Sequence, residues 1–413
     1  MSWFPKPINS IKDLNISKNF IHEMILKILY SEGVKLGKEI SNIIHISFNQ
    51  IEDELLYLKS RELVIVTSSV GGTTGYHAMK FELSSKGRAM AKEFFNVRPY
   101  IGPLPVQMAD YIESVKSQKV NNTSVTIDHV KSLFKKMILK KELLQKLGPA
   151  INSGGPLFLY GKPGNGKTMI AEEIIEAMKG ELYIPHSILV DGQIIRFFDK
   201  KTHKKTGECK EDKRWIKIKR PLIVVGGELT LPMLDLIYKD EFKSYEAPFQ
   251  LMANGGILLI DDFGRQLISP KDLLNRWIYP LEKKVDFLTL VTGKKVEVPF
   301  NQMLIFSTNL NPNDLADEAF WRRIKYKIEI ESPSFDEFKI IFKDQCKKNE
   351  LVFRDSVFDY LVINYYKKLK MEPRGVHARD LISHVVDFIH FYKLEKKISK
   401  KSIDFSWKCY FSI

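Results

Sequence analysis

A glycine-rich turn followed by lysine and threonine has the spacing of a phosphate-binding loop. Residues Gly161–Thr168 have the pattern G-x-x-x-x-G-K-T, which cradles phosphates when it joins a strand to a helix. The apolar run Leu157–Tyr160 predicts a buried strand before it, and the segment from Lys167 to Lys179 predicts a helix. Turn N–H groups and the positive helix end would face phosphate oxygens. The alternative is a glycine-rich surface turn. We expect nucleotide contacts from Gly161, Pro163, Gly164, Asn165, Gly166, Lys167, Thr168 and Met169.

Two carboxylates follow a second buried run. The aliphatic residues Ile257–Ile260 predict a strand, and Asp261 and Asp262 come directly after it. Ligands of an α/β sheet bind at the carboxyl ends of its strands. We therefore expect Thr168 and Asp261 to hold Mg²⁺, which prefers hard oxygen ligands, and Asp262 to orient and polarise an attacking water. The alternative is that the two aspartates only cap the next helix.

An amide and four arginines complete the set of candidate residues. The apolar run 302–308 predicts another buried strand. Asn309 after it could hydrogen-bond the attacking water or the γ-phosphate. The arginines are Arg322 and Arg323, at the end of a short helix expected over 317–324, and Arg374 and Arg379, near the start of the last long helix.

In this order, the motifs resemble those of the AAA+ ATPases, over roughly residues 127–391. The phosphate loop resembles Walker A, Ile257–Asp262 resembles Walker B, and Asn309 resembles sensor 1. The resemblance implies ATP and Mg²⁺ as cofactors, with ATP hydrolysis as the reaction. The fold it implies is α/β: a P-loop parallel-sheet core, an all-helical C-terminal lid and an N-terminal winged-helix domain.

The same resemblance assigns roles to the arginines and implies assembly. Arg322 or Arg323 would be the arginine finger, which acts on the γ-phosphate bound by a neighbouring subunit. Arg379 or Arg374 would be sensor 2. A finger works only across a head-to-tail contact, which closes into a ring or winds into a helix. We expect a homo-oligomeric ring, of six subunits.

One residue departs from the family pattern. The second acid of Walker B is usually glutamate, whereas this chain has Asp262. Aspartate is one methylene shorter, so its carboxylate reaches about 1.5 Å less far. Slow turnover is therefore an open alternative. The segments 253–256 and 262–265 look similar to a bacterial group of AAA+ proteins with an N-terminal winged helix.

The chain of 413 residues is long enough for several domains. Before the nucleotide-binding region, three helices, a hairpin with Gly71–Gly72 at its tip and a closing helix resemble a winged helix. The acidic residues of Glu52–Glu54 on the third helix would repel DNA phosphates. This favours a protein over DNA as the partner of the winged helix. The expected parts are a tail (1–18), the winged helix (19–96), a linker (97–126), the α/β domain (127–332) and the helical lid (333–413).

Three expectations concern the α/β region in detail. One basic amphipathic helix is expected over Ile127–Leu147, and a helical region over Leu231–Asn254. Strands are expected over Tyr183–Phe198 and Trp215–Val225, with a polar, largely basic insertion at 199–214 between them. That insertion is either a solvated hairpin tip or a loop that touches a substrate or partner.

Composition and charge limit the class of protein. Hydrophobic residues make up 44% and charged residues 28% of the chain, as in globular proteins. We expect no membrane insertion, because no apolar run approaches the 18 residues of a membrane helix. Three scattered cysteines and an N-terminus without an apolar signal core favour a cytoplasmic protein. The net charge of +14 favours polyanionic partners such as nucleotides or nucleic acid.

The leading interpretation is an oligomeric ATPase that uses Mg²⁺ and ATP to remodel a protein or protein complex, releasing ADP. A second is a nucleic-acid-linked ATPase, such as a helicase loader, recombination factor or transcription regulator. A third is a scaffold that binds ATP but scarcely hydrolyses it.

Overall fold

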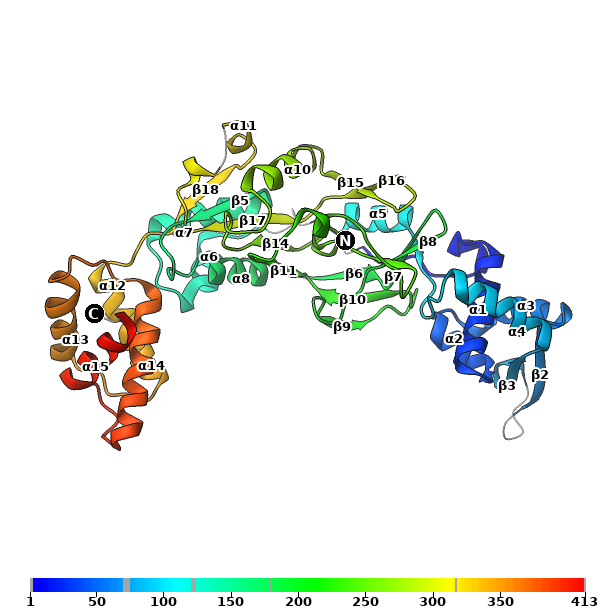
Figure 1. Cartoon of the computed structure of the whole chain (residues 1–413), viewed down its shortest axis with the longest axis horizontal. Coiled ribbons are helices and arrows are strands. Elements are labelled where there is room, and N and C mark those ends of the chain that lie inside the picture. Colours follow the sequence, from blue (N-terminus) through cyan, green and yellow to red (C-terminus); the bar gives the residue numbers. More distant parts are fainter. Residues whose placement is uncertain (1–2, 70–74, 120–123, 179, 316–317, 412–413) are drawn as a thin grey trace.

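The computed structural model of the chain describes residues 3–69, 75–119, 124–178, 180–315 and 318–411. The molecule is elongated, with the N-terminal helices at one end, the sheets in the middle and the C-terminal helices at the other end (Figure 1). Within these residues, no helix combines the length and the hydropathy needed to cross a membrane. The hairpin tip at Gly71–Gly72 and the expected helix start at Asp317 fall outside the described residues.

A parallel sheet of five strands forms the centre of the molecule. Its inner strands are apolar runs, as expected where both faces are buried. The order across the sheet is β11 (Leu222–Val225), β14 (Ile257–Ile260), β17 (Met303–Thr308), β5 (Leu157–Tyr160) and β18 (Tyr326–Glu329). The strands that precede the phosphate loop, the two aspartates and Asn309 are thus neighbours, with β17 in the middle. Because the strands are parallel, their carboxyl ends lie at one edge.

Helices cover both faces of this sheet. Alternate strand residues point to opposite faces, so Leu157 and Leu159 lie in one core and Phe158 in another. The first core includes side chains of α6 (Ile127–Leu133), α7 (Lys141–Ser153) and α8 (Lys167–Ala177), and the second those of α10 (Pro270–Lys283). The predicted α/β fold, built on a parallel sheet around a phosphate loop, is confirmed.

The single helix predicted over Ile127–Leu147 is wrong. Helix α6 ends at Leu133 and α7 begins at Lys141. The turn between them carries Met137 beside the phosphate loop, where its Cε would lie 3.1 Å from a Cβ on Gly166. This tertiary packing outweighs the helical propensity of the segment.

The N-terminal part consists of helices around a small antiparallel sheet. Its elements are α1 (Lys18–Glu32), β1 (Lys35–Leu36), α2 (Gly37–Ile44), α3 (Phe48–Ser60), β2 (Val64–Ser69), β3 (Met79–Leu83) and α4 (Ser85–Val97). The sheet order is β1-β3-β2. The hydroxyls of Ser17 and Ser84 cap the N-termini of α1 and α4. The core of this part also contains Leu189 and Ile194 from the middle of the chain, so the two parts share packing.

Residues between α8 and β11 form more sheet structure than predicted. The strand expected over Tyr183–Phe198 is three strands, β6 (Glu181–Pro185), β7 (Ser187–Val190) and β8 (Gln193–Arg196). The turn between β7 and β8 is Asp191-Gly192, with φ of 47° and 72°, a sequence that favours two-residue hairpin turns. The strand expected over Trp215–Val225 divides at Arg220–Pro221 into β10 (Trp215–Lys219) and β11. Proline cannot continue the hydrogen-bond ladder.

The insertion at 199–214 contains β9 (Lys205–Glu208), which pairs with β10. The helical region expected over Leu231–Asn254 is wrong in its larger part. Only a 3₁₀ turn (Leu231–Leu234) and α9 (Phe249–Met252) are helical, and β12 (Ile237–Lys239) and β13 (Ser244–Glu246) lie between them. Strand β13 pairs with β8, far back in the sequence. Short-range periodicity carries no signal for such a pairing.

Further strands complete the middle of the molecule. Strand β4 (Val106–Gln107), just before α5 (Met108–Ser117), joins the sheet β12-β13-β8-β7-β4, and β15 (Val285–Thr289) pairs with β16 (Lys295–Pro299). The C-terminal part is helical, as predicted: α12 (Phe335–Lys348), α13 (Asp355–Leu361), α14 (Gly375–Tyr392) and α15 (Lys400–Phe411). Helix α15 is longer than the short aromatic tail that was expected over Phe405–Phe411.

Candidate active site

The phosphate loop joins β5 to α8 through three glycines with positive φ. These angles are 140° at Gly161, 82° at Gly164 and 85° at Gly166, which side chains other than glycine rarely adopt. At Gly161 a side chain would also overlap the carbonyl oxygen of Ile330, just after β18. The loop therefore lies directly against the adjacent strand end.

Lys167 is the first residue of α8, and its side chain folds back over the loop. Its ammonium group donates to the carbonyl oxygens of Gly161 (2.9 Å) and Lys162 (3.1 Å) and to Asn309 Oδ1 (2.6 Å). The residue is 7% exposed. Burial lowers the pKa of Lys167, while the nearby carboxylates of Asp261 and Asp262 act in the opposite direction. The ammonium group thus uses its three N–H donors on acceptors of the chain, and a phosphate oxygen could replace one of them.

The two residues predicted to hold Mg²⁺ lie next to each other. Thr168 Oγ1 donates to Asp261 Oδ2 over 2.8 Å, which links the start of α8 to the end of β14. One hydroxyl and one carboxylate match the sparse protein ligands with which Mg²⁺ is commonly bound beside phosphates. Among the described residues, no group of three His, Cys, Asp or Glu side chains could form a separate all-protein metal site. The hydroxyl of Thr168 and the carboxylate of Asp261 are therefore suitable ligands for Mg²⁺.

Asp262 and Asn309 meet at the ends of β14 and β17. Asn309 Nδ2 donates to Asp262 Oδ1 over 3.1 Å while its Oδ1 accepts from Lys167. The backbone of Asp262 has a φ of 48°, and its N–H donates to Asp261 Oδ1 over 3.0 Å. Aspartate adopts this left-handed conformation more often than most residues.

Residues that the sequence analysis missed hold the turn after β14. Gln266 Nε2 donates to the carbonyl oxygen of Asp261 over 2.8 Å, and its Oε1 accepts from the N–H of Gly264 over 2.8 Å. Thr308 Oγ1 donates to Phe263 O over 2.6 Å. These residues position the two aspartates. No local pattern marks a glutamine or threonine for this role, because the contacts depend on how the turn closes.

The C-terminal helices lie against the phosphate loop through the N-terminus of α14. The N–H of Val376 donates to the carbonyl oxygen of Gly164 over 2.9 Å. Lys162 Nζ and Glu372 Oε2 form an exposed ion pair at 2.6 Å. A side chain at Gly164 would overlap Val376 Cγ1. The sequence analysis named Arg374 and Arg379 on either side of Val376 but not Val376 itself, whose bond is made by its main chain.

Gly164→Ala is expected to cost about 1–3 kcal/mol more unfolding free energy than Gly293→Ala, because its Cβ would overpack Val376. Gly293 is the matched control, since its φ of 80° is close to the 82° of Gly164 and no described atom lies within 4 Å of the position that a Cβ would take there. Denaturant unfolding of both variants measures the difference. Equal losses of unfolding free energy in the two variants would mean that backbone strain alone destabilises them and that α14 does not pack against the loop.

The predicted sensor arginines differ in position. Arg374 is half-buried and comes directly before α14, next to the residues that contact Gly164. Arg379 is exposed, and its Nε pairs with Asp380 Oδ1 at 2.8 Å. Of the two, Arg374 is therefore placed closer along the chain to the contact with the phosphate loop.

The predicted finger arginines follow α11 (Glu318–Trp321) rather than lying within it. Arg322 pairs with Glu318 at 2.9 Å, and both side chains are largely exposed, at 75% and 82%. Arg323 pairs with Glu282 of α10 at 2.5 Å and is only 24% exposed. Exposed ion pairs are weak, so Arg322 can leave its partner at little cost, whereas Arg323 belongs to the packing of this chain.

A cavity of about 100 Å³ lies beside the loop, between the turn after α6, the end of β18 and the start of α14. Its lining includes Ile138, Leu139, Asn165, Ile330 and Gly375. Within the described part of the chain, the buried Oδ1 of Asn165 has no hydrogen-bond partner. A buried acceptor without a partner is costly, so it is suited to accept from a ligand.

Comparisons with known proteins give weak similarities. A family model described as a domain of unknown function (DUF8689) matches residues 334–409, which lie in the C-terminal helices. No curated protein matches the chain. Similarities this limited assign neither an activity nor a partner.

Among solved structures, a mutant of RuvB from Thermotoga maritima is 15% identical with a TM-score of 0.41, covering 67% of this chain and 72% of that one. The Thermotoga maritima RuvB Holliday junction branch migration motor is 14% identical, with a TM-score of 0.39 and coverage of 70% and 72%. NtrX from Brucella abortus, in complex with ADP, is 12% identical, with a TM-score of 0.42 and coverage of 66% and 57%.

Proposed function

We propose that the chain is a Mg²⁺-dependent ATPase of the AAA+ type. The observation that carries this proposal is the bonded set Lys167–Asn309–Asp262, beside the Thr168–Asp261 pair. Three neighbouring strand ends bring together a phosphate-binding cation, two oxygen ligands and a carboxylate–amide pair. This combination serves phosphoryl transfer to water, in which the protein mainly positions groups and offsets charge.

Each residue has a defined role in the proposed mechanism. The loop N–H groups and Lys167 hold the β- and γ-phosphates, and Thr168 and Asp261 hold Mg²⁺. Mg²⁺, when bound, neutralises charge that develops on the phosphate oxygens. Asp262 accepts a proton from the attacking water, and Asn309 orients that water. The cavity lined by Ile138 and Asn165 would receive the base of ATP.

The proposal includes a homo-oligomeric ring, most simply of six subunits, in which an arginine of one subunit reaches the γ-phosphate held by the next. The exposure of Arg322 supports its assignment as that finger. ATP-driven motion of the C-terminal helices would act on a protein or protein complex. The N-terminal helices and sheet have the element order of a winged helix, which we propose as the partner-binding part.

Asp262→Asn is expected to lower kcat about 10²–10⁴-fold, because the amide cannot accept the proton. Asp262→Glu is expected to give no gain, since the Asp262 carboxylate already accepts from Asn309 Nδ2 over 3.1 Å and a longer side chain would displace that contact. Steady-state ATPase assays with Mg²⁺ measure both, with Asp240→Asn on the exposed surface as the control. The molecular mass of the wild-type protein in solution with ATP tests whether the ring forms.

Three outcomes would contradict the proposal in different ways. Tight ATP binding without turnover in the wild type would exclude an ATPase and leave an ATP-gated scaffold. Turnover that survives in Asp262→Asn would show that another group acts as the base. A wild type that stays monomeric with ATP would remove the ring and, with it, the role of Arg322.

A further inference from the structure

A second cavity, of about 600 Å³, lies where the N-terminal helices meet the insertion at 199–214. We call it the junction pocket and define it by His45, His186, Phe198, Lys200, Lys204 and Lys213. None of these residues belongs to the active site described above. The volume is that of pockets that hold small organic ligands.

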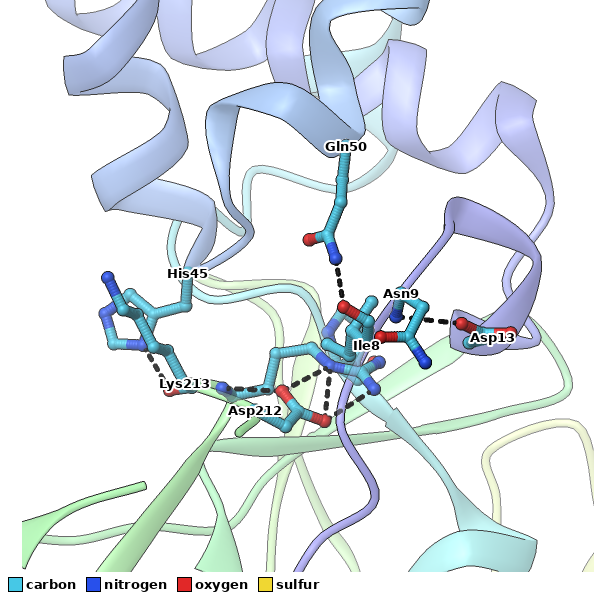
Figure 2. A network of polar contacts seen from close by, with 9 residues as sticks. Ile8, Asn9, Asp13, His45, Gln50, Asp212 and Lys213 are labelled. Carbon is cyan, nitrogen blue, oxygen red and sulfur yellow. Dashed lines mark hydrogen bonds and ion pairs between the residues drawn. The ribbon is translucent and has the colours of Figure 1, made fainter. Parts of the chain in front are cut away.

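Polar contacts fix the two sides of the junction pocket relative to each other. Figure 2 shows the side chains of His45 and Gln50, from the N-terminal helices, bonded to main-chain atoms. His45 Nδ1 lies 2.7 Å from the carbonyl oxygen of Lys213 in the insertion. Gln50 donates to the carbonyl oxygen of Ile8, whose own N–H donates to Glu211 O over 3.4 Å. These contacts hold the N-terminal helices and the insertion, which form the walls of the pocket, against each other.

The pocket is strongly positive. Four lysines line it, and Glu208 is the one acid among the described lining residues. Glu208 pairs with Lys205 at 2.9 Å, which leaves the charges of Lys200, Lys204 and Lys213 for a ligand. Like charges at one site repel, so the arrangement favours an anion that neutralises them.

Aromatic rings form the remaining wall. The ring of His186 lies 4.8 Å from that of His45 and 5.6 Å from that of Phe198, and His203 stacks on Phe198 at 5.9 Å. Burial, with the charges of His45 and Lys205, lowers the pKa of His186 to about 4. Burial also lowers the pKa of His203, whose Nε2 lies 3.1 Å from Met252 O. The rings of His186 and His203 are therefore neutral near pH 7.

We propose that the junction pocket binds single-stranded nucleic acid, with one base against the rings of His186 and Phe198 and its phosphates on Lys200, Lys204 and Lys213. Stacking rings beside lysines are the features that hold single strands without sequence preference. An acidic peptide would use the lysines but leave the rings uncovered. A duplex keeps its bases stacked inside and could offer only its backbone to the rim.

The positive wall continues beyond the pocket. A neighbouring cavity of about 650 Å³ shares Lys200, His203 and Lys204 with it and adds Lys201 and Lys219. Its lining also includes acidic residues of α8, which repel a phosphate backbone. A bound strand would therefore follow the side formed by the insertion, over more than one nucleotide.

The test is fluorescence anisotropy of a labelled oligothymidylate with the full chain, without ATP, over a salt series. Each phosphate contact in a single strand contributes about 0.7 to the slope of log K against log salt. The double variant Lys204→Ala/Lys213→Ala is expected to weaken binding at least about tenfold and lower the slope by about 1.4. The matched control is Lys347→Ala/Lys348→Ala on α12, which is expected to bind as the wild type does.

Phe198→Leu tests the rings, and is expected to weaken binding about fivefold or more with an unchanged salt slope. Unchanged affinity in the double lysine variant would overturn the proposal. So would a poly-glutamate chain that competes as well as the oligonucleotide, which would point to an acidic protein, or a duplex of equal length that binds as tightly. Lys167→Met is expected to bind the oligonucleotide with the affinity of the wild type. The proposed nucleic-acid site and the proposed ATPase activity can therefore be tested independently.

Discussion

Lys167→Met is expected to lower kcat/KM for ATP about 10²–10³-fold and to remove ATP-dependent stabilisation of the fold. The ammonium group is the cation of the site, and preorganised donors of this kind are each worth about 10²–10³ in rate. Methionine keeps the length and the apolar stem of a side chain that is 7% exposed, so packing is preserved. Steady-state kinetics and thermal unfolding with and without MgATP measure the two effects.

Lys162→Met is the control for this variant, because Lys162 is in the same loop but forms an exposed ion pair with Glu372. We expect it to keep most of its activity, since exposed pairs contribute about 1 kcal/mol or less. If Lys167→Met still hydrolysed ATP and was still stabilised by it, the phosphate loop would not be the nucleotide site.

Arg322→Ala is expected to lower kcat about 10³–10⁵-fold while ATP binding and folding stay near normal. Its side chain is 75% exposed and touches Glu318 of the preceding helix α11, so its loss disturbs little within the subunit. Arg323→Ala is the matched comparison. It would break the pair with Glu282 and is expected to lower thermal stability instead. The reverse result would assign the finger to Arg323.

Mixing two inactive variants tests whether the finger acts between subunits. Lys167→Met lacks a working phosphate loop but keeps Arg322, and Arg322→Ala has the opposite defect. In a head-to-tail ring mixed at random in equal amounts, about a quarter of the contacts join an intact loop to an intact finger. Activity should therefore return towards that level. No recovery in mixed rings would mean that Arg322 acts within its own subunit or not at all.

The positions of the central candidate residues could be predicted because the information that places them is local. A strand, a glycine turn and a helix in succession place Lys167, and an apolar run places the carboxylates of Asp261 and Asp262 at its end. Parallel pairing then brings them to one edge. The bonds of Lys167 to Asn309 and of Thr168 to Asp261 follow from that placement.

Non-local pairing explains the errors. Strand β13 lies in a segment predicted to be helical, yet Tyr245 pairs with Ile195 and Glu246 with Arg196 of β8. Strand propensity depends on such neighbours more than on the segment itself. The contact of Val376 with Gly164 could not be predicted from the sequence either, because it joins two main-chain groups more than 200 residues apart.

At the junction between the N-terminal part and the insertion, the hydrogen-bond acceptors are main-chain carbonyl oxygens. His45 is bonded to the carbonyl oxygen of Lys213, and Gln50 donates to that of Ile8 (Figure 2). The N–H of Ile8 in turn donates to the carbonyl oxygen of Glu211. A carbonyl oxygen is present whatever the side chain, so the two ends of each side-chain bond differ in their tolerance of substitution. The two side-chain bonds depend on His45 and Gln50, whereas the side chains at Ile8 and Lys213 can change without loss of the acceptor. The lysine at 213 can thus be exchanged to alter the charge of the surface while the joint stays closed, so binding preference and domain attachment can be tuned independently.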